Sequence, residues 1–399
     1  MNTKPILHLP SRKIAFRDRI LPEDARFSIP NLTAEACKRM PALRRRQFAE
    51  IFVTVALWCA PVAAFAQQIL GSGSTFAYPV VEHWSEAYEK ISGIHVTYQP
   101  IGSVAGITEI KSNIVDFGIT DAALVDAQLL RDGLAQFPVT VGAIVPVVNL
   151  GGIAAGQLHL TGRLLADIYL GKVKNWNDAA IAAVNPGIEL PDQAIWVIYR
   201  SDGSGTTYNW ADFLSKVSDE WKIKVGVGTT VAWPRGAGGK GNEGVAQNVA
   251  HVKGAIGYVE YEYALHERLI YGLVQNRAGN FVPPDALSLR ATMEGVDWTK
   301  ERNFYVLLND APGAHAYPIM ATSFALIRRY PSDLARNRDT LAFFGWAIEH
   351  GQSIADSLHH VPLPPSLLQQ IECYWEENVR NPCAASASPP ILNALIDKA

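Results

Sequence analysis

QAIWVIYRSDGSGTTYNWADFLSKV, residues 193 to 217, holds an apolar run, a loop of glycine and hydroxyl residues, and an amphipathic run in immediate succession. The run QAIWVIYR is rich in β-branched and aromatic residues and predicts a strand. SDGSGTT supplies residues that favour a turn and a helix N-terminus. YNWADFLSKV has the spacing of a helix. A strand, a tight loop and a helix in this order predict one βα unit of an α/β fold.

The same order of strand, loop and helix recurs nearer the N-terminus. A short apolar strand leads through GSGSTF, residues 71 to 76, into a predicted helix. In that helix Val80, Trp84, Tyr88 and Ile91 are spaced to share one face, which we expect to be buried. A second βα unit is therefore predicted here.

Further strands and helices are predicted between and beyond these two units. The predicted strands are IHVTYQPIG (94–102), VDFGITD (115–121), KGAIGYVEYEYA (253–264) and PIMATSFALIRR (318–329). Predicted helices begin at Ser103 and cover ALVDAQLLRDGLA (123–135), LAFFGWAIEHG (341–351) and SLLQQIECYWEE (366–377). Such alternation predicts α/β layers with mainly parallel sheets, in which ligands bind at the carboxyl ends of the strands.

One apolar run is suited to link two halves of such a fold. FPVTVGAIVPVVNL, residues 137 to 150, is apolar at almost every position, which is typical of a buried strand, and we expect it to cross between two lobes. With 399 residues and an apolar content of 48%, the chain is long enough for two domains with sizeable cores. No stretch after residue 66 holds the roughly eighteen consecutive apolar residues of a membrane span, so we expect none there.

Residues 40 to 66 have the three parts of a cleaved secretory signal peptide. Three consecutive arginines precede the apolar core IFVTVALWCAPVAAFA, residues 51 to 66, whose last three residues form a small-x-small cleavage site. We therefore expect a start at Met40, a non-native upstream extension in residues 1–39, and a periplasmic location. A short membrane anchor, or a lipid anchor on Cys59, is the alternative interpretation.

The charge balance of the expected mature chain is acidic. Residues 1 to 66 hold 11 of the 35 Lys and Arg residues and 5 of the 38 Asp and Glu residues, which leaves 24 basic against 33 acidic residues. An acidic surface argues against nucleic acid or anionic lipid as a partner. The remaining cysteines are Cys373 and Cys383, and an oxidising compartment favours a disulfide between them, with two free thiols as the alternative.

The loop SDGSGTT is suited to hold an anion. Ser204, Gly205 and Thr206 stand at the predicted helix N-terminus, where unpaired N–H groups and the helix dipole attract negative charge. Arg200, at the end of the preceding strand, adds a planar fork that matches a tetrahedral oxyanion. Asp202 is placed to hold that arginine. An N-capped helix beside a surface arginine is the alternative.

Other loops repeat these donors where a strand gives way to a helix. Their residues are Ser74-Thr75-Phe76, Ser103 and Thr120-Asp121. Together the loops predict convergence on one ligand. A carboxylate such as Asp121 can share the proton of hydrogen phosphate, but facing an unprotonated oxyanion such as sulfate costs several kcal/mol, on the order of a thousandfold in affinity. A plain helix N-cap is the alternative role of Asp121.

Seven stretches give the chain a family resemblance. They are GSGSTFAYPVVEHW, YQPIGSVAGI, VDFGITDAAL, DIYLGKVKNWND, RSDGSGTTY, VAWPRGAGGKGNEG and GAIGYVEYEYA. In these stretches the chain resembles the periplasmic phosphate-binding proteins of phosphate-specific ABC importers, the PstS family, from about Ile69 to Trp375. The resemblance implies a two-lobed type II periplasmic binding protein, with lobes at 67–149 plus 319–399 and at 150–318. It also implies a monomer without cofactor or metal that clasps inorganic phosphate between its lobes and delivers it to membrane permease subunits.

The resemblance further implies the ligand contacts. The positions that match the family's phosphate contacts are Thr75, Phe76, Ser103, Asp121, Arg200, Ser204, Gly205 and Thr206, with Asp202 supporting Arg200. One departure lies beside them, because Val104-Ala105 stand where the family commonly has a small Ser-Gly pair. The tail beyond Trp375 is not covered by the resemblance.

An enzyme is one alternative, and the motifs do not favour it. GAGGKG, residues 236 to 241, formally fits a dinucleotide-binding loop but follows no clear strand, and Lys240 precedes Gly241 where a P-loop has Ser or Thr. The sequence has no G-x-S-x-G elbow and no H-E-x-x-H metal spacing. We expect the adjacent His359-His360 pair on a solvated surface. The sequence thus predicts no catalytic residues.

Two further alternatives keep the fold. One is a surface, adhesion or phosphate-sensing protein, against which the intact set of predicted contacts argues, since a pure scaffold needs none of them. The other is a receptor for another tetrahedral oxyanion. Arsenate matches phosphate in charge and proton and stays open, whereas Asp121 argues against sulfate.

Overall fold

The computed structural model describes residues 68–294, 296–300 and 303–380. The predictions for residues 1–39 and 40–66 and for Cys383 lie outside this range, while Cys373 is exposed on a C-terminal helix.

The strands are β1 (Gln68–Gly73), β2 (His95–Gln99), β3 (Phe117–Thr120), β4 (Leu134–Val148), β5 (His159–Leu160), β6 (Trp196–Arg200), β7 (Ala237–Gly239), β8 (Ala255–Glu260), β9 (Ile270–Tyr271), β10 (Leu273–Gln275), β11 (Phe281–Val282) and β12 (Met320–Arg328). The helices are α2 (Tyr78–Ser92), α3 (Ser103–Lys111), α4 (Asp126–Asp132), α5 (Gly162–Tyr169), α6 (Ala179–Val184), α7 (Gly205–Val217), α8 (Asp219–Lys224), α9 (Gly241–His251), α10 (Tyr261–His266), α11 (Ala286–Glu294), η2 (Trp298–Lys300), α12 (Leu334–Glu349), α13 (Gln352–Ser357), α14 (Pro365–Trp375) and η3 (Glu376–Arg380).

Most strands of the described part form one mixed sheet, in the order β2-β1-β3-β12-β4-β8-β6-β7, with β9 also on β4. A smaller sheet has the order β11-β10-β5. The strands at either end of the main sheet pair in parallel, as expected for βα units. The prediction of mainly parallel sheets was wrong for the middle, because β12 returns antiparallel to both β3 and β4, and β4 is antiparallel to β8.

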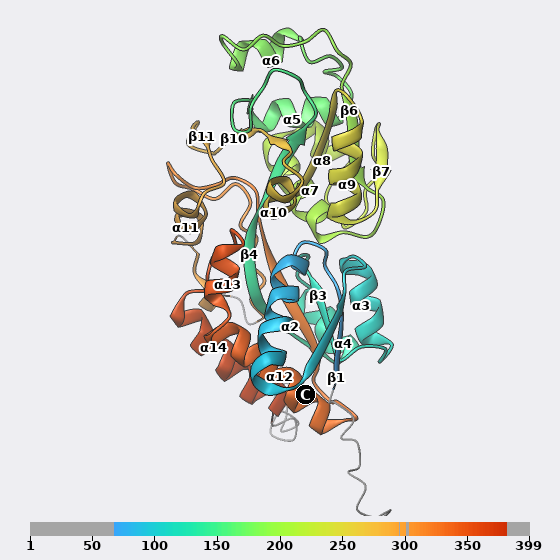
Figure 1. Cartoon of the computed structure of the whole chain (residues 1–399), viewed down its shortest axis with the longest axis vertical. Coiled ribbons are helices and arrows are strands. Elements are labelled where there is room, and N and C mark those ends of the chain that lie inside the picture. Colours follow the sequence, from blue (N-terminus) through green and yellow to red (C-terminus); the bar gives the residue numbers. More distant parts are fainter. Residues whose placement is uncertain (1–67, 295, 301–302, 381–399) are drawn as a thin grey trace, which may run out of the picture. The chain divides into compact units, whose positions relative to one another are not determined.

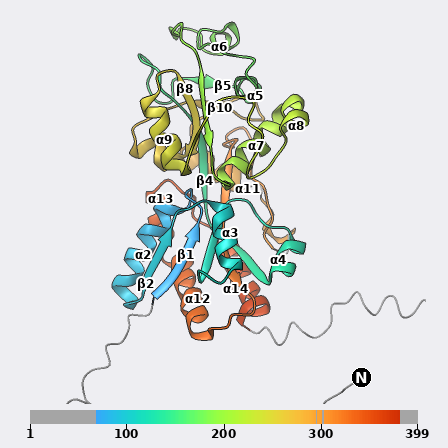
Figure 2. The same cartoon turned by 90° about the vertical axis from the view of Figure 1, so that its right-hand side faces the viewer.

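Strand β4 connects two groups of elements. Its residues Leu134–Ala143 pair with β12, and its residues Ile144–Val148 pair with β8. In Figures 1 and 2, the blue and teal elements β1, β2, α2 and α3 gather with the orange helices α12 and α14 at one end of β4, and the green and yellow α5, α7, α8 and α9 gather at the other. The buried strand predicted from the apolar run is confirmed, and all of its residues are buried.

A register shift interrupts the pairing of β4 with β12. Ser323 lies opposite Thr140, but the next residue, Phe324, lies opposite Pro138, so β4 carries one extra residue. Proline has no N–H to donate to the ladder, and bulges of this kind often re-aim a side chain beside a functional site. Here the bulge lies next to the place where Ser323 meets the loop after β3.

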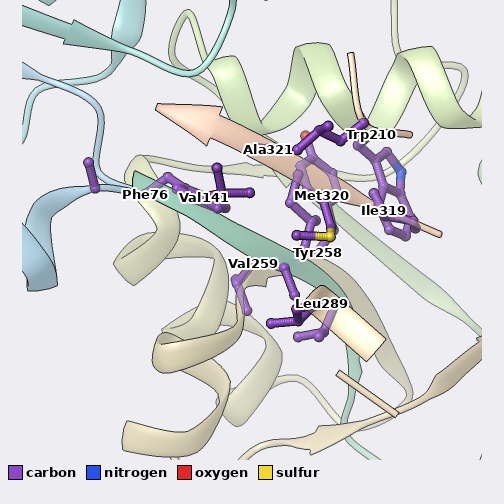
Figure 3. Close-up of a cluster of buried hydrophobic side chains, with 14 of the residues drawn as sticks. Phe76, Val141, Trp210, Tyr258, Val259, Leu289, Ile319, Met320 and Ala321 are labelled. Atoms are coloured by element: carbon purple, nitrogen blue, oxygen red, sulfur yellow. The ribbon is translucent and has the colours of Figure 1, made fainter. Parts of the chain in front are cut away.

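The core runs along β4 and beneath the helices on both sides of it. Figure 3 shows part of this core, including Trp210 from α7 and Tyr258 from β8, whose rings stack with their centroids 4.9 Å apart. Both side chains are fully buried, and each such burial stabilises the fold by about 1.5–3 kcal/mol. Phe76, just before α2, belongs to the same core, so packing fixes the first predicted contact loop.

Three local predictions were wrong. Ile91 is 65% exposed, because it falls in the last turn of α2, next to Gly93, which ends that helix in a left-handed conformation. The strand predicted over 253–264 ends at Glu260, whose carboxylate caps α10 and so starts a helix there. His360 is buried rather than solvated, because it packs between β4 and the end of β8.

The described residues include no helix that combines the length and the apolar character needed to cross a membrane. Within the same residues, no three His, Cys, Asp or Glu side chains are grouped so that they could hold a metal ion.

Candidate anion-binding site

Asp121 follows β3 and is the centre of the predicted site. Its Oδ2 accepts hydrogen bonds from Ser74 Oγ at 2.7 Å and more weakly from Ser103 Oγ at 3.5 Å, and its Oδ1 accepts one from Ser323 Oγ at 2.7 Å. The side chain is almost fully buried, and this burial raises the carboxyl pKa to about 6. The hydroxyls of Ser74 and Ser323 and the charge of Arg200 oppose that rise. The plain N-cap role is wrong, since α4 begins only at Asp126.

The loop between β1 and α2 presents the second set of predicted contacts. Ser74 Oγ accepts from the amide of Phe76 at 2.9 Å, which folds the loop over Asp121. Thr75 Oγ1 accepts from both the backbone N and the Nδ2 of Asn242, at 3.1 and 2.9 Å. Tyr263 donates its hydroxyl to the carbonyl of Thr75 at 2.8 Å. Elements from both ends of β4 therefore hold this loop.

Arg200, at the end of β6, is held in a fixed orientation. Its Nε and Nη2 donate to the two carboxylate oxygens of Asp202, at 2.9 and 2.6 Å, and its Nη1 donates to Thr206 Oγ1 at 3.1 Å. Burial raises the pKa of Asp202, but the hydrogen bonds and charge of Arg200 outweigh burial and leave that pKa lowered. Asp202 Oδ1 also accepts from the amide of Gly241. Asp202 thus contacts Arg200, and its role in supporting a ligand contact stays a prediction.

The start of α7 meets Asp121 directly. The amide of Gly205 donates to Ser103 Oγ at 3.0 Å, and Asn209 donates its Nδ2 to the carbonyl of Asp121 at 2.7 Å. A Cβ on residue 205 would lie 2.6 Å from the Cβ and 2.7 Å from the N of Asp121. Only glycine permits this approach. Ser204 is the N-cap of α7, since its Oγ accepts from the amide of Thr207 at 3.0 Å.

The Val104-Ala105 departure from the family pattern lies on the rim of this site. The amide of Val104 donates to the carbonyl of Gly203 at 3.1 Å. A Cβ on residue 203 would lie 2.6 Å from the Cβ of Val104, so glycine makes room for the valine. The larger side chain is thus accommodated without displacing Ser103 from Gly205.

The structure brings all eight predicted contacts into one connected cluster. Ser103 and Asp121 touch the start of α7, Thr206 touches Arg200, and Asp202 reaches the N-terminus of α9, where Asn242 holds Thr75. Side-chain hydroxyls, backbone amides and one guanidinium line the cluster, and its one central carboxylate accepts hydrogen bonds. Such a set suits an anion that carries a proton.

Sequence reasoning missed several residues that complete the site, namely Ser323, Asn242, Asn209 and Tyr263. A proline inside a predicted strand marks a bulge, and Pro138 was the available signal for Ser323. Asn242 lies inside the quoted stretch VAWPRGAGGKGNEG, but only the folded chain shows that it reaches Thr75.

A pocket of about 660 Å³ opens beside the cluster, and Thr75, Asp202 and Gly241 line it. Its outer wall carries Glu82, Glu243, Glu262 and Glu267 against Lys240, His83 and His266. The surroundings of the site are therefore not a general positive field. An anion bound here would have to be attracted by local dipoles, hydrogen bonds and Arg200.

Comparisons with known proteins identify the family of the chain. A family model described as PBP superfamily domain matches residues 60–348. The phosphate-binding protein PstS of Xylella fastidiosa (strain 9a5c) is 51% identical over 308 residues, which are 77% of this chain and 85% of that protein. The phosphate-binding protein PstS of Pasteurella multocida (strain Pm70) is 46% identical over 316 residues, 79% of this chain and 92% of that protein.

Among solved structures, a high affinity periplasmic phosphate-binding protein (PfluDING) bound with phosphate aligns with a TM-score of 0.63 and 19% identity, over 77% of this chain and 93% of that chain. At that identity the likeness shows the fold alone, which is the two-lobed α/β fold of periplasmic binding proteins. The sequence identities to named relatives and the extent of both matches decide the family: the chain belongs to the PstS family of phosphate-binding proteins.

Proposed function

We propose that the chain binds inorganic phosphate, as hydrogen or dihydrogen phosphate, and delivers it to the permease of an ABC importer in the periplasm. The observation that carries the proposal is Asp121, a buried carboxylate that accepts hydrogen bonds from serine hydroxyls and feels the charge of Arg200. A carboxylate at the centre of an anion site is favourable only when the anion brings a proton to share.

The proposed ligand contacts are those of the sequence prediction. They are Thr75, Phe76, Ser103, Asp121, Arg200, Ser204, Gly205 and Thr206, with Asp202 supporting Arg200. Backbone amides at the start of α7 and around Phe76 would donate to the phosphate oxygens, and Arg200 would neutralise its charge. The protein would act by binding alone, as a monomer, without a cofactor or a metal.

Closure of two lobes around the ligand is the proposed mechanism. The proposed lobes are residues 67–149 with 319–399, and residues 150–318, joined through β4. Ligand contacts from both lobes would stabilise the closed state, which the permease would recognise. Export through a signal peptide at residues 40–66 would bring the chain to the periplasm. A surface, adhesion or sensing role is not favoured, while arsenate stays open as a second ligand.

Calorimetric titration of the purified protein, stripped of bound ligand, tests this function. We expect tight binding of phosphate and at least a thousandfold weaker binding of sulfate, because sulfate has no proton for Asp121. Arsenate, titrated in parallel, is expected to bind because it carries that proton. A folded protein that binds neither phosphate nor arsenate would contradict the proposal.

Substituting Gly205→Ala should weaken phosphate binding about thirtyfold. The new Cβ would overlap the Cβ and backbone of Asp121, and overpacking of this kind costs about 2 kcal/mol. Gly151→Ala is the matched control, since a Cβ there meets no atom within 4 Å. The two dissociation constants are compared by calorimetry. Equal affinities for both variants would show that the approach of Gly205 to Asp121 does not matter for binding.

A further inference from the structure

Behind the anion site lies a buried pair of ionisable groups that the proposed contacts do not use. The side chains of Glu260 and His360 are both 0% exposed, and Glu260 Oε1 lies 3.5 Å from His360 Nε2. His360 Nδ1 lies 2.9 Å from Thr140 Oγ1 on β4. Among the described residues, Glu260 Oε2 has no hydrogen-bond partner. Buried charges left without compensation are strongly unfavourable, so each of these groups depends on the other.

His360 contacts the predicted phosphate loop through Phe76. The two rings meet edge to face, with centroids 5.5 Å apart and planes at 74°. The amide of the next residue, Val361, donates to the carbonyl of Val141 at 2.7 Å, which anchors this segment to β4. Because the Phe76 side chain is fully buried, the imidazole is one of the groups that restrict its position.

Glu260 contacts the same loop through α10. Its Oε1 accepts from the amide of Glu262 at 2.8 Å and so caps that helix. One residue further along, Tyr263 donates its hydroxyl to the carbonyl of Thr75 at 2.8 Å. The amide of Glu260 itself donates to Asn242 Oδ1 at 3.0 Å, which orients the amide group that holds Thr75. Both members of the pair thus converge on two adjacent predicted contacts.

Other titratable groups face this pair. Burial and the charge of Glu260 raise the pKa of Glu262, whereas His359 and His360 lower it. His359 lies on the outer side, with its Nε2 4.0 Å from Glu262 Oε2. On the inner side, the charge of His360 acts on Asp121 and lowers its pKa. The charge on His360 is therefore linked electrostatically both to α10 and to the centre of the anion site.

We propose that His360 and Glu260 are a charge-coupled pair of positioning residues, which hold Phe76 and Thr75 in place for the anion from opposite sides. This inference rests on the proposed function. The pair lies outside the predicted set of ligand contacts and acts through the loop between β1 and α2. Anion affinity therefore depends on both charges, although neither residue belongs to the predicted set of contacts.

A double-mutant cycle tests the proposal. Phosphate affinity is measured by calorimetry for the wild-type protein, His360→Gln, Glu260→Gln and the double variant, because glutamine keeps hydrogen-bonding atoms at each position and removes the charge. We expect each single substitution to weaken binding about tenfold, and the double variant to be little weaker than either single one. His359→Gln is the matched control, and it should bind like the wild type.

A pH series separates a charged role from simple packing. Imidazole side chains generally change charge between pH 5 and 8. Titration of phosphate itself is the same for the wild-type and His360→Gln proteins and cancels in the ratio of their dissociation constants. The ratio therefore reports His360 together with its effect on Asp121. We expect this ratio to be larger at pH 5.5 than at pH 8.

Three results would overturn the inference: a folded His360→Gln protein with wild-type affinity, single losses that multiply in the double variant, or a ratio that does not change with pH. If His360→Gln does not fold, Glu260→Gln and Thr140→Val carry the test, since Thr140→Val removes only the Nδ1 partner. If the wild type does not bind phosphate, both the proposed function and this inference are wrong. If the wild type binds phosphate and the variants bind it equally well, only the inference is wrong.

Discussion

Arg200→Met is expected to weaken phosphate binding by about two to four powers of ten. The guanidinium is almost fully buried and paired with Asp202. Its removal takes away the cation that we propose for phosphate binding, and it leaves the carboxylate of Asp202 buried without its partner. Removing one partner of a buried charge pair costs about 3–5 kcal/mol, which corresponds to two to four powers of ten in affinity. Calorimetry on the variant and the wild type measures the change directly.

The loss of Arg200 as a ligand contact must be separated from damage to the fold. Arg163→Met is the matched control, because Arg163 lies on the exposed side of α5 and pairs with Asp167 there, so we expect unchanged affinity. The double substitution Arg200→Met with Asp202→Asn removes the unpaired carboxylate. It should regain stability in urea unfolding but not phosphate binding. Recovery of binding in the double variant would mean that Arg200 serves only to neutralise Asp202.

Much of the fold could be predicted because its signals are local. The apolar run of β4 and the strand, loop and helix at 193–217 each specify their own conformation, and the structure confirms both. The direction of the middle strands could not be predicted in this way. The antiparallel return of β12 depends on which strands it lies between, and its own sequence, a nearly continuous apolar run, is equally suited to either direction.

The same distinction holds for the site. Ser204, Gly205 and Arg200 lie close together in the sequence, so the sequence alone predicts that they form one anion-binding loop. Ser323 lies in a buried strand far along the chain, and it reaches Asp121 because β12 pairs antiparallel with β3, with Phe324 opposite Thr120. His360 was misjudged for the same reason, since two adjacent histidines in sequence lie one inside and one outside the core.

The second large effect concerns Asp121→Asn, which should reduce the ratio of phosphate affinity to sulfate affinity by roughly a thousandfold. The carboxylate repels sulfate and accepts the proton of phosphate, whereas an amide repels neither anion. Calorimetry with both anions gives the ratio. Asp116→Asn is the matched control, because Asp116 precedes β3 as Asp121 follows it and is also partly buried, but its carboxylate accepts from the amide of Leu70 instead. A ratio unchanged in Asp121→Asn would remove Asp121 as the source of selectivity.

Titration of Asp121 should also make the stability of the ligand-free protein depend on pH. Its pKa is raised by burial to about 6, above the usual 3.8, so between these values the folded state keeps a proton that the unfolded state has lost. Stability therefore falls as the pH rises from about 4 to 6, by about 3 kcal/mol in total, and stays lower above pH 6. Asp121→Asn lacks this titration, so its free energy of unfolding in urea should exceed that of the wild type at pH 7 and approach it at pH 4. The carboxylate of Asp121 thus destabilises the empty site at neutral pH, and we expect the binding of a protonated anion to offset that cost.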